Sequence, residues 1–128
     1  MRTAFACFLV LAALTGGCTY EQQQPLPCVF PDTVSFRQDI QPIFAAHCTS
    51  IDCHAGLHPA GNLHLESDQA YAELSDPRSG YVDTLQPRIS VLYAQMISVS
   101  NPMPPSGNLD DCTIALVLTW IEQKARNN

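Results

Sequence analysis

The chain has 128 residues, of which 46% are apolar and 14% are charged, with six cysteines and a formal net charge of −6. This length favours a single domain, and six basic residues against twelve acidic ones argue against the basic face that a nucleic-acid binder needs. Six cysteines are also unusual in the reducing cytosol unless they hold a metal.

Residues 1–17 have the pattern of a signal peptide. Arg2 gives a short positive region, and the apolar stretch 4–14 is shorter than the roughly 20 helical residues that span a bilayer core. The small residues before Cys18 resemble a bacterial lipobox, in which this cysteine becomes the lipidated first residue of the mature protein. Thr19 is similar to the residue that follows in lipoproteins sent to the outer membrane. We therefore expect a lipid-anchored protein of the bacterial cell envelope, at the outer membrane, with a plain secretory signal as the alternative.

Residues 18–31 are expected to form a lipidated tether and residues 32–128 the folded domain. The stretch 21–27 (EQQQPLP) is polar and contains proline, as short linkers do. Because Arg2 leaves with the signal, the mature chain of 111 residues keeps five basic and twelve acidic side chains, a net charge of −7.

Apolar residues recur at helical spacing in the first part of the domain. After the capping pair Asp32-Thr33 they predict a helix that either starts or kinks at Pro42. The stripe of this helix is Phe36, Ile40, Ile43, Phe44 and His47. Residues 48–64 are rich in Cys, His and Gly and are expected to form a loop, followed by a short helix over 66–74.

Two further helices are predicted in the second half. One begins after Pro87-Arg88 and stops at Asn101-Pro102, with a stripe of Ile89, Leu92, Met96 and Val99. Residues 101–107 (NPMPPSG) form a stiff loop because proline fixes φ. The last helix is capped within 108–111 and carries Ile114, Val117, Leu118, Ile121 and Ala125 on one side. Nothing predicts a confident strand, so the expected fold class is all-α.

The segment Cys48 to His54 concentrates the chemistry. A cysteine directly followed by histidine, here Cys53-His54, with another cysteine upstream, is typical of covalent haem attachment. Two thiols bind the haem vinyl groups while the histidine binds the iron. The gap between the cysteines is four residues instead of the usual two, and this length demands an extra bulge, which Ser50 and Asp52 suit.

Two other interpretations of the same segment stay open. Cys48 and Cys53 could close a small disulfide, with His54 an ordinary surface residue. Alternatively, Cys48, Cys53 and His54 could hold a tetrahedral Zn²⁺ together with His58 or His64.

Met103 is the candidate for a second axial ligand. It belongs to no helical stripe and lies between prolines in a rigid loop, whereas Met96 lies on an apolar stripe and is expected in the core. A thioether opposite a histidine gives a haem suited to electron transfer. Either His58 or His64 could replace Met103, although His64 is expected to face solvent, and His47 is expected to end a helix.

Five short motifs in order resemble small c-type cytochromes, and most of all the planctomycete-type cytochrome c domains and their lipoprotein relatives. The first runs from Phe36…Asp39-Ile40…Pro42-Ile43-Phe44 to Cys48…Cys53-His54-Ala55-Gly56, and the other four are Gly61-Asn62-Leu63-His64-Leu65, Ser90-Val91-Leu92, Met103-Pro104-Pro105 and Trp120-Ile121-Glu122. The resemblance covers about residues 34–125. Two departures are the four-residue gap and Lys124-Ala125 where relatives have Gly-Ala.

The resemblance implies a small all-helical fold around one covalent haem c, with the first and last helices crossing beside it. Cys48 and Cys53 would form the thioethers, His54 would be the proximal ligand of the iron and Met103 the distal one. Water would be excluded by Phe36, Phe44 and Trp120.

Cys28 and Cys112 have no other task. In an exported protein an unassigned pair favours a disulfide, and here the two lie before the first helix and at the start of the last, which are expected to meet. Two buried free thiols are the alternative.

The expected function is that of a membrane-anchored monohaem cytochrome c that carries single electrons and is not an enzyme. Its acidic charge suits redox partners with a basic docking surface. The alternative is a zinc- or disulfide-stabilised structural or sensory lipoprotein without redox activity.

Overall fold

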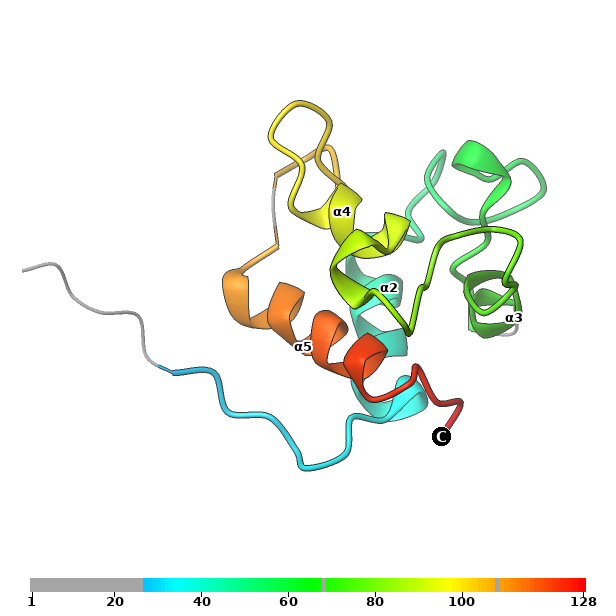
Figure 1. The fold of residues 1–128 in the computed structure, drawn as a ribbon. Helices are drawn as coiled ribbons and strands as arrows, with labels where there is room; N and C mark the ends of the chain where they lie inside the picture. Colours follow the sequence, from blue (N-terminus) through cyan, green and yellow to red (C-terminus); the bar gives the residue numbers. More distant parts are fainter. Residues whose placement is uncertain (1–26, 68, 108) are drawn as a thin grey trace, which may run out of the picture.

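The computed structural model describes residues 27–67, 69–107 and 109–128. The signal peptide 1–17 and Cys18 lie outside these residues, and the tether is described only from residue 27. The described chain is helical and contains no β-strand (Figure 1), so the predicted fold class is confirmed at this level. None of the helices in these ranges is both long and apolar enough to cross a membrane.

The first helical segment changes its winding at the predicted proline. It begins as a π-helical segment, η2 (Phe36–Ile40), and continues as α2 (Gln41–His47), with Pro42 in the first turn of α2. A proline is tolerated there because the first turn of a helix leaves its N–H groups without intrahelical partners. The segment is thus interrupted at Pro42, as the sequence predicts, and His47 ends the helix.

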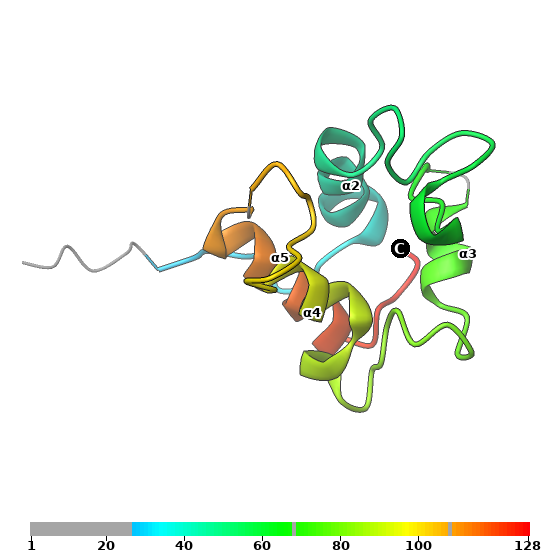
Figure 2. The ribbon, with the colours of Figure 1, turned by 90° about the horizontal axis from the view of Figure 1, so that it is seen from above.

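Helix α5 (Asp111–Glu122) packs against η2, the short η4 (Pro87–Ile89) and α4 (Val91–Met96). Figure 2 shows α4 alongside α5, with α3 on the other side of the molecule. The predicted cap is Asp110, whose carboxylate accepts a hydrogen bond from the Thr113 amide at 3.0 Å. Helix α5 therefore joins the start of the first helical segment to η4 and α4.

Ala125 does not belong to α5, contrary to the prediction. The helix ends at Glu122, and Lys124 and Ala125 both have positive φ. The Ala125 amide still donates to the Trp120 carbonyl at 2.9 Å, which turns the chain back over the helix end and keeps the Ala125 side chain buried. The residue is in the core for a reason other than helical spacing.

The second predicted helix is shorter than expected. The chain turns at Glu66, whose carbonyl accepts from the Gln69 amide, and α3 (Ala70–Leu74) begins only after that turn. Residues 48–64 form a loop as predicted, interrupted by one turn of 3₁₀-helix, η3 (Ala60–Asn62).

The predicted third helix is wrong at both ends. Ser90 is fully buried in an extended conformation, and its hydroxyl accepts from the Asp83 amide at 2.8 Å, which separates η4 from α4. Ile89 therefore lies before α4 and is 62% exposed. Helix α4 ends at Met96, and Val99, beyond its end, is 97% exposed. Met96 is buried as predicted, but the four residues do not share one buried stripe.

Phe36 is the centre of an aromatic cluster in the core. Its ring centroid lies 5.1 Å from that of Tyr71, 5.3 Å from Trp120 and 6.3 Å from Phe44. The Tyr71 hydroxyl donates to the Ala125 carbonyl, which joins α3 to the segment after α5. This cluster holds the first helical segment, α3 and α5 together.

The beginning and end of the described domain are tied to each other. Cys28 and Cys112 form the predicted disulfide, with their Cα atoms 5.4 Å apart. The side-chain oxygen of Gln123 accepts from the Val34 amide, and Asn128 accepts from the amides of Phe36 and Arg37. The disulfide fixes the chain before η2 to the start of α5. The hydrogen bonds fix the entry to η2 to the segment that follows α5.

Replacing Phe36 with alanine is expected to lower the free energy of unfolding by about 3–5 kcal/mol, because a buried aromatic ring and its packing are lost. Val99→Ala is the control and should change it by less than about 0.5 kcal/mol, since that side chain lies in solvent. Urea unfolding followed by circular dichroism measures both. A large loss in Val99→Ala would contradict the exposed position of Val99.

Candidate functional site

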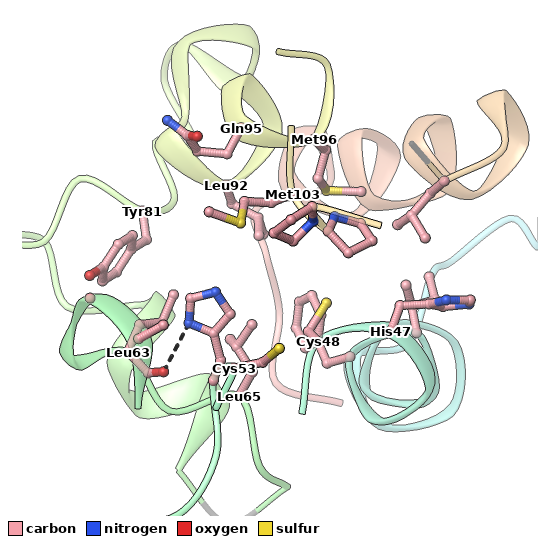
Figure 3. Close-up of a pocket in the computed structure, with 18 of the residues that line it drawn as sticks. His47, Cys48, Cys53, Leu63, Leu65, Tyr81, Leu92, Gln95, Met96 and Met103 are labelled. Atoms are coloured by element: carbon pink, nitrogen blue, oxygen red, sulfur yellow. Dashed lines mark hydrogen bonds between the residues drawn. The ribbon is translucent and has the colours of Figure 1, made fainter. Parts of the chain in front are cut away.

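One apolar pocket lies between two walls of the domain, with a cavity volume of about 240 Å³. The lower wall comes from the end of α2 and the loop that follows it, and the upper wall from α4 and the proline-rich loop after it. Figure 3 shows Met103 and Cys53 facing each other across the open centre. The four predicted haem residues, Cys48, Cys53, His54 and Met103, all line this pocket.

The loop from Cys48 to His54 closes on itself. The His54 amide donates to the Cys48 carbonyl at 3.0 Å, and the Cys53 amide donates to the Ser50 carbonyl at 2.9 Å. Asp52 takes a positive φ of 66° to complete the turn. The extra residues between the cysteines therefore form the expected bulge, and both thiols remain in the pocket lining.

His54 is held by backbone groups on both sides. Its carbonyl accepts from the Leu65 amide at 2.8 Å, and its Nδ1 lies 3.2 Å from the Leu63 carbonyl (dashed line in Figure 3). A carbonyl only accepts, so Nδ1 carries the proton, and the lone pair of the neutral ring is then on Nε2. This tautomer leaves Nε2 free to bind a metal ion.

Met103 is positioned by a backbone contact to α4. Its amide donates to the Gln95 carbonyl at 3.0 Å, and Pro104, Pro105 and Leu109 extend the same wall. A thioether is a soft ligand that suits iron in haem proteins. The upper wall thus offers the sulfur of Met103 from a segment that proline makes stiff, and the second sulfur of this wall, that of Met96, belongs to a buried core residue.

Tyr81 and Gln95 are polar lining residues that the sequence did not indicate. Figure 3 shows Tyr81 on one side of the pocket and His47 on the opposite side. The side-chain oxygen of Gln95 is buried without a hydrogen-bond partner among the described residues. A buried acceptor of this kind costs free energy until a donor reaches it, so it marks a place for a polar group of a ligand or a water.

Burial raises the pKa of the Cys48 thiol to about 11, with a further contribution from the neighbouring Cys53. The neutral thiol is therefore the form of Cys48 at neutral pH. Cys53 accepts a hydrogen bond from the Ser50 hydroxyl at 3.0 Å. Both cysteines are free in the described chain, so the small Cys48–Cys53 disulfide is not formed.

His58 and His64 do not line the pocket. His64 is half-buried, contrary to the solvent-facing position expected for it, because Nδ1 lies 2.7 Å from Glu73 and Nε2 lies 3.1 Å from the Gly56 carbonyl. In the ranges described, no group of three or more His, Cys, Asp or Glu side chains is arranged to hold a metal ion. The side chains of the zinc alternative do not gather into one site here.

Of the three aromatic residues expected to shield the site, only Phe44 lines it. Phe36 and Trp120 are buried in the core. They support the lower wall from behind and do not form the pocket surface.

Comparison of the chain with family models, with curated proteins and with solved structures found no match.

In the chain without a cofactor, Cys48 should react with iodoacetamide roughly 100-fold more slowly at pH 8.5 in the folded protein than in urea. A pKa of about 11 leaves little thiolate at that pH, whereas the unfolded thiol is about half ionised. Fragmentation of the tryptic peptide 38–78, which carries both Cys48 and Cys53, separates the two sites by mass spectrometry and gives the rate at Cys48. Equal rates in both conditions would contradict a shielded Cys48.

Proposed function

We propose that this chain is a monohaem c-type cytochrome that carries single electrons in the bacterial cell envelope. The observation that supports it best is the arrangement of one pocket, with Cys48, Cys53 and His54 on one wall and Met103 on the opposite wall. Two thiols, an imidazole and a thioether are the donors that a covalent haem takes. We also propose that the all-α domain has the cytochrome c-like fold that the sequence resemblance implies.

The residues present fit the group. The two thiols would hold the haem by thioether bonds, and the Leu63 carbonyl fixes the His54 tautomer that leaves Nε2 for the iron. The rest of the lining is largely apolar, with Leu63, Leu65, Leu92 and Met96 on its surface.

The bound haem would supply one-electron redox chemistry at its iron. Met103 would bind as the distal ligand, which raises the potential relative to a second histidine. The unpaired side-chain oxygen of Gln95 would accept a hydrogen bond from a water or another donor beside the cofactor. The apolar side chains of the lining would keep water away from a bound haem, and this would limit the solvent reorganisation that slows electron transfer.

The setting of this chemistry follows from the remainder of the chain. A lipid on Cys18 would anchor the domain to the outer membrane through the tether, and the acidic net charge suits a redox partner with a basic docking surface. We propose an electron carrier and not an enzyme, because the sequence has one attachment motif and a candidate ligand for each axial position. The alternative, a structural or sensory lipoprotein without redox activity, would be a colourless chain.

The mature protein, secreted by cells with a cytochrome c maturation system, is expected to contain one covalently bound haem. Acid–acetone should fail to extract it, and the pyridine haemochrome spectrum should show two saturated thioether positions. Cys48→Ala and Cys53→Ala should each shift that spectrum towards one free vinyl group, while Cys28→Ser leaves it unchanged. A colourless protein with stoichiometric zinc would sink the proposal.

Met103→Ala should abolish the weak sulfur-to-iron charge-transfer absorption of the ferric protein, because the thioether proposed as the distal ligand is lost. Met96→Ala is the matched control. Met96 also lies in the pocket lining but belongs to the core, so this variant should keep the band and lose stability, by about 2–5 kcal/mol. If the band disappeared in Met96→Ala and persisted in Met103→Ala, the ligand would be Met96, and the assignment to Met103 would be wrong.

A further inference from the structure

The peptide group between Leu63 and His64 is hydrogen-bonded at both of its ends. Its carbonyl faces Nδ1 of His54 at 3.2 Å, and its N–H donates to the Glu73 carboxylate at 2.7 Å. Carboxylate, peptide and imidazole therefore form one continuous chain. Hydrogen bonds in such a chain polarise one another, and the bond to an ionised acceptor is the strongest member.

Glu73 is fixed in this chain by its second oxygen. That oxygen lies 2.7 Å from Nδ1 of His64, so one carboxylate binds both the backbone and the side chain of the same residue. The other ring nitrogen of His64 contacts the Gly56 carbonyl at 3.1 Å. Both side chains are largely shielded, with 23% of His64 and 29% of Glu73 exposed. The contact thus has a defined geometry and is partly screened from water.

We infer that Glu73 is a positioning residue that sets the electron donation of His54 through the Leu63–His64 peptide. A negative charge on the N–H side draws the peptide proton and makes the Leu63 oxygen a stronger acceptor. A stronger acceptor pulls on the Nδ1 proton and makes Nε2 a better donor to a metal. This inference rests on the proposed function for its effect on haem, where better donation favours ferric iron and lowers the midpoint potential.

The chain offers a matched control for the charge alone. Glu66 carries the same charge and accepts from the Gly56 amide at 3.0 Å, on the same loop, whereas the hydrogen bond to the His64 amide is made by Glu73. A change at Glu66 therefore reports the through-space effect of a lost carboxylate. Glu73→Asp supplies the complementary variant, because it keeps the charge and is one methylene too short to hold the same contacts.

The experiment compares Glu73→Gln, Glu73→Asp and Glu66→Gln with the wild type, after circular dichroism has shown equal helix content. In the haem-loaded protein both Glu73 variants should raise the midpoint potential, and Glu66→Gln should raise it less than Glu73→Gln does. Equal shifts in the two glutamine variants, with none in Glu73→Asp, would mean that charge acts through space and would overturn the relay.

A second readout needs no haem. In the full chain without cofactor, labelled with ¹⁵N, the His54 ring at pH 8 should be mainly the Nδ1–H tautomer in the wild type and in Glu66→Gln. Both Glu73 variants should lose part of this preference. An unchanged His54 spectrum in both Glu73 variants overturns the relay, whatever the redox result. A wild-type chain that never takes up haem defeats the proposed function alone and leaves this comparison decisive.

Discussion

The hydrogen bond from the His54 amide to the Cys48 carbonyl is the contact on which the candidate site depends. It brings the residue after the loop back to the end of α2, so that two thiols and an imidazole share one wall of the pocket. The Leu65 amide then binds the His54 carbonyl and returns the chain towards the core. Neither contact involves a side chain, so the wall is built by the backbone and its chemistry is added by the residues placed on it.

The opposite wall is built on a different part of the fold. Helix α4 packs on α5, and the loop that carries Met103 is joined to the end of α4 by the hydrogen bond from the Met103 amide to the Gln95 carbonyl. The two walls are held at a fixed separation by the packing of α5 on the first helical segment, where Phe36 and Trp120 lie in the core. A pocket with donors on both walls therefore needs the whole domain, and the aromatic cluster supports it without entering it.

Candidate site residues could be predicted from the sequence because their chemistry depends on residue type. Helix limits and side-chain positions that depend on long-range contacts could not. Cysteines, a histidine and an isolated methionine between prolines could be recognised because few other jobs suit them. The limits of α4 could not, because Ser90 leaves the helix to bind the backbone of Asp83, and periodicity carries no sign of such a contact. The prediction that His64 faces solvent was wrong for the same reason, because its partner Glu73 is nine residues further along the chain.

The length of the loop between Cys48 and Cys53 and the location of the two thiols are separate properties of this chain. Ile51, at its outer side, is 89% exposed, while the cysteines on either side remain in the pocket lining. The number of residues between the thiols is thus accommodated at the surface, while the place of both thiols in the pocket lining is set by the fold. Within segment 49–52, Ile51 is free to vary as a surface epitope does, whereas Ser50 and Asp52 shape the turn and Asp52 also lines the pocket.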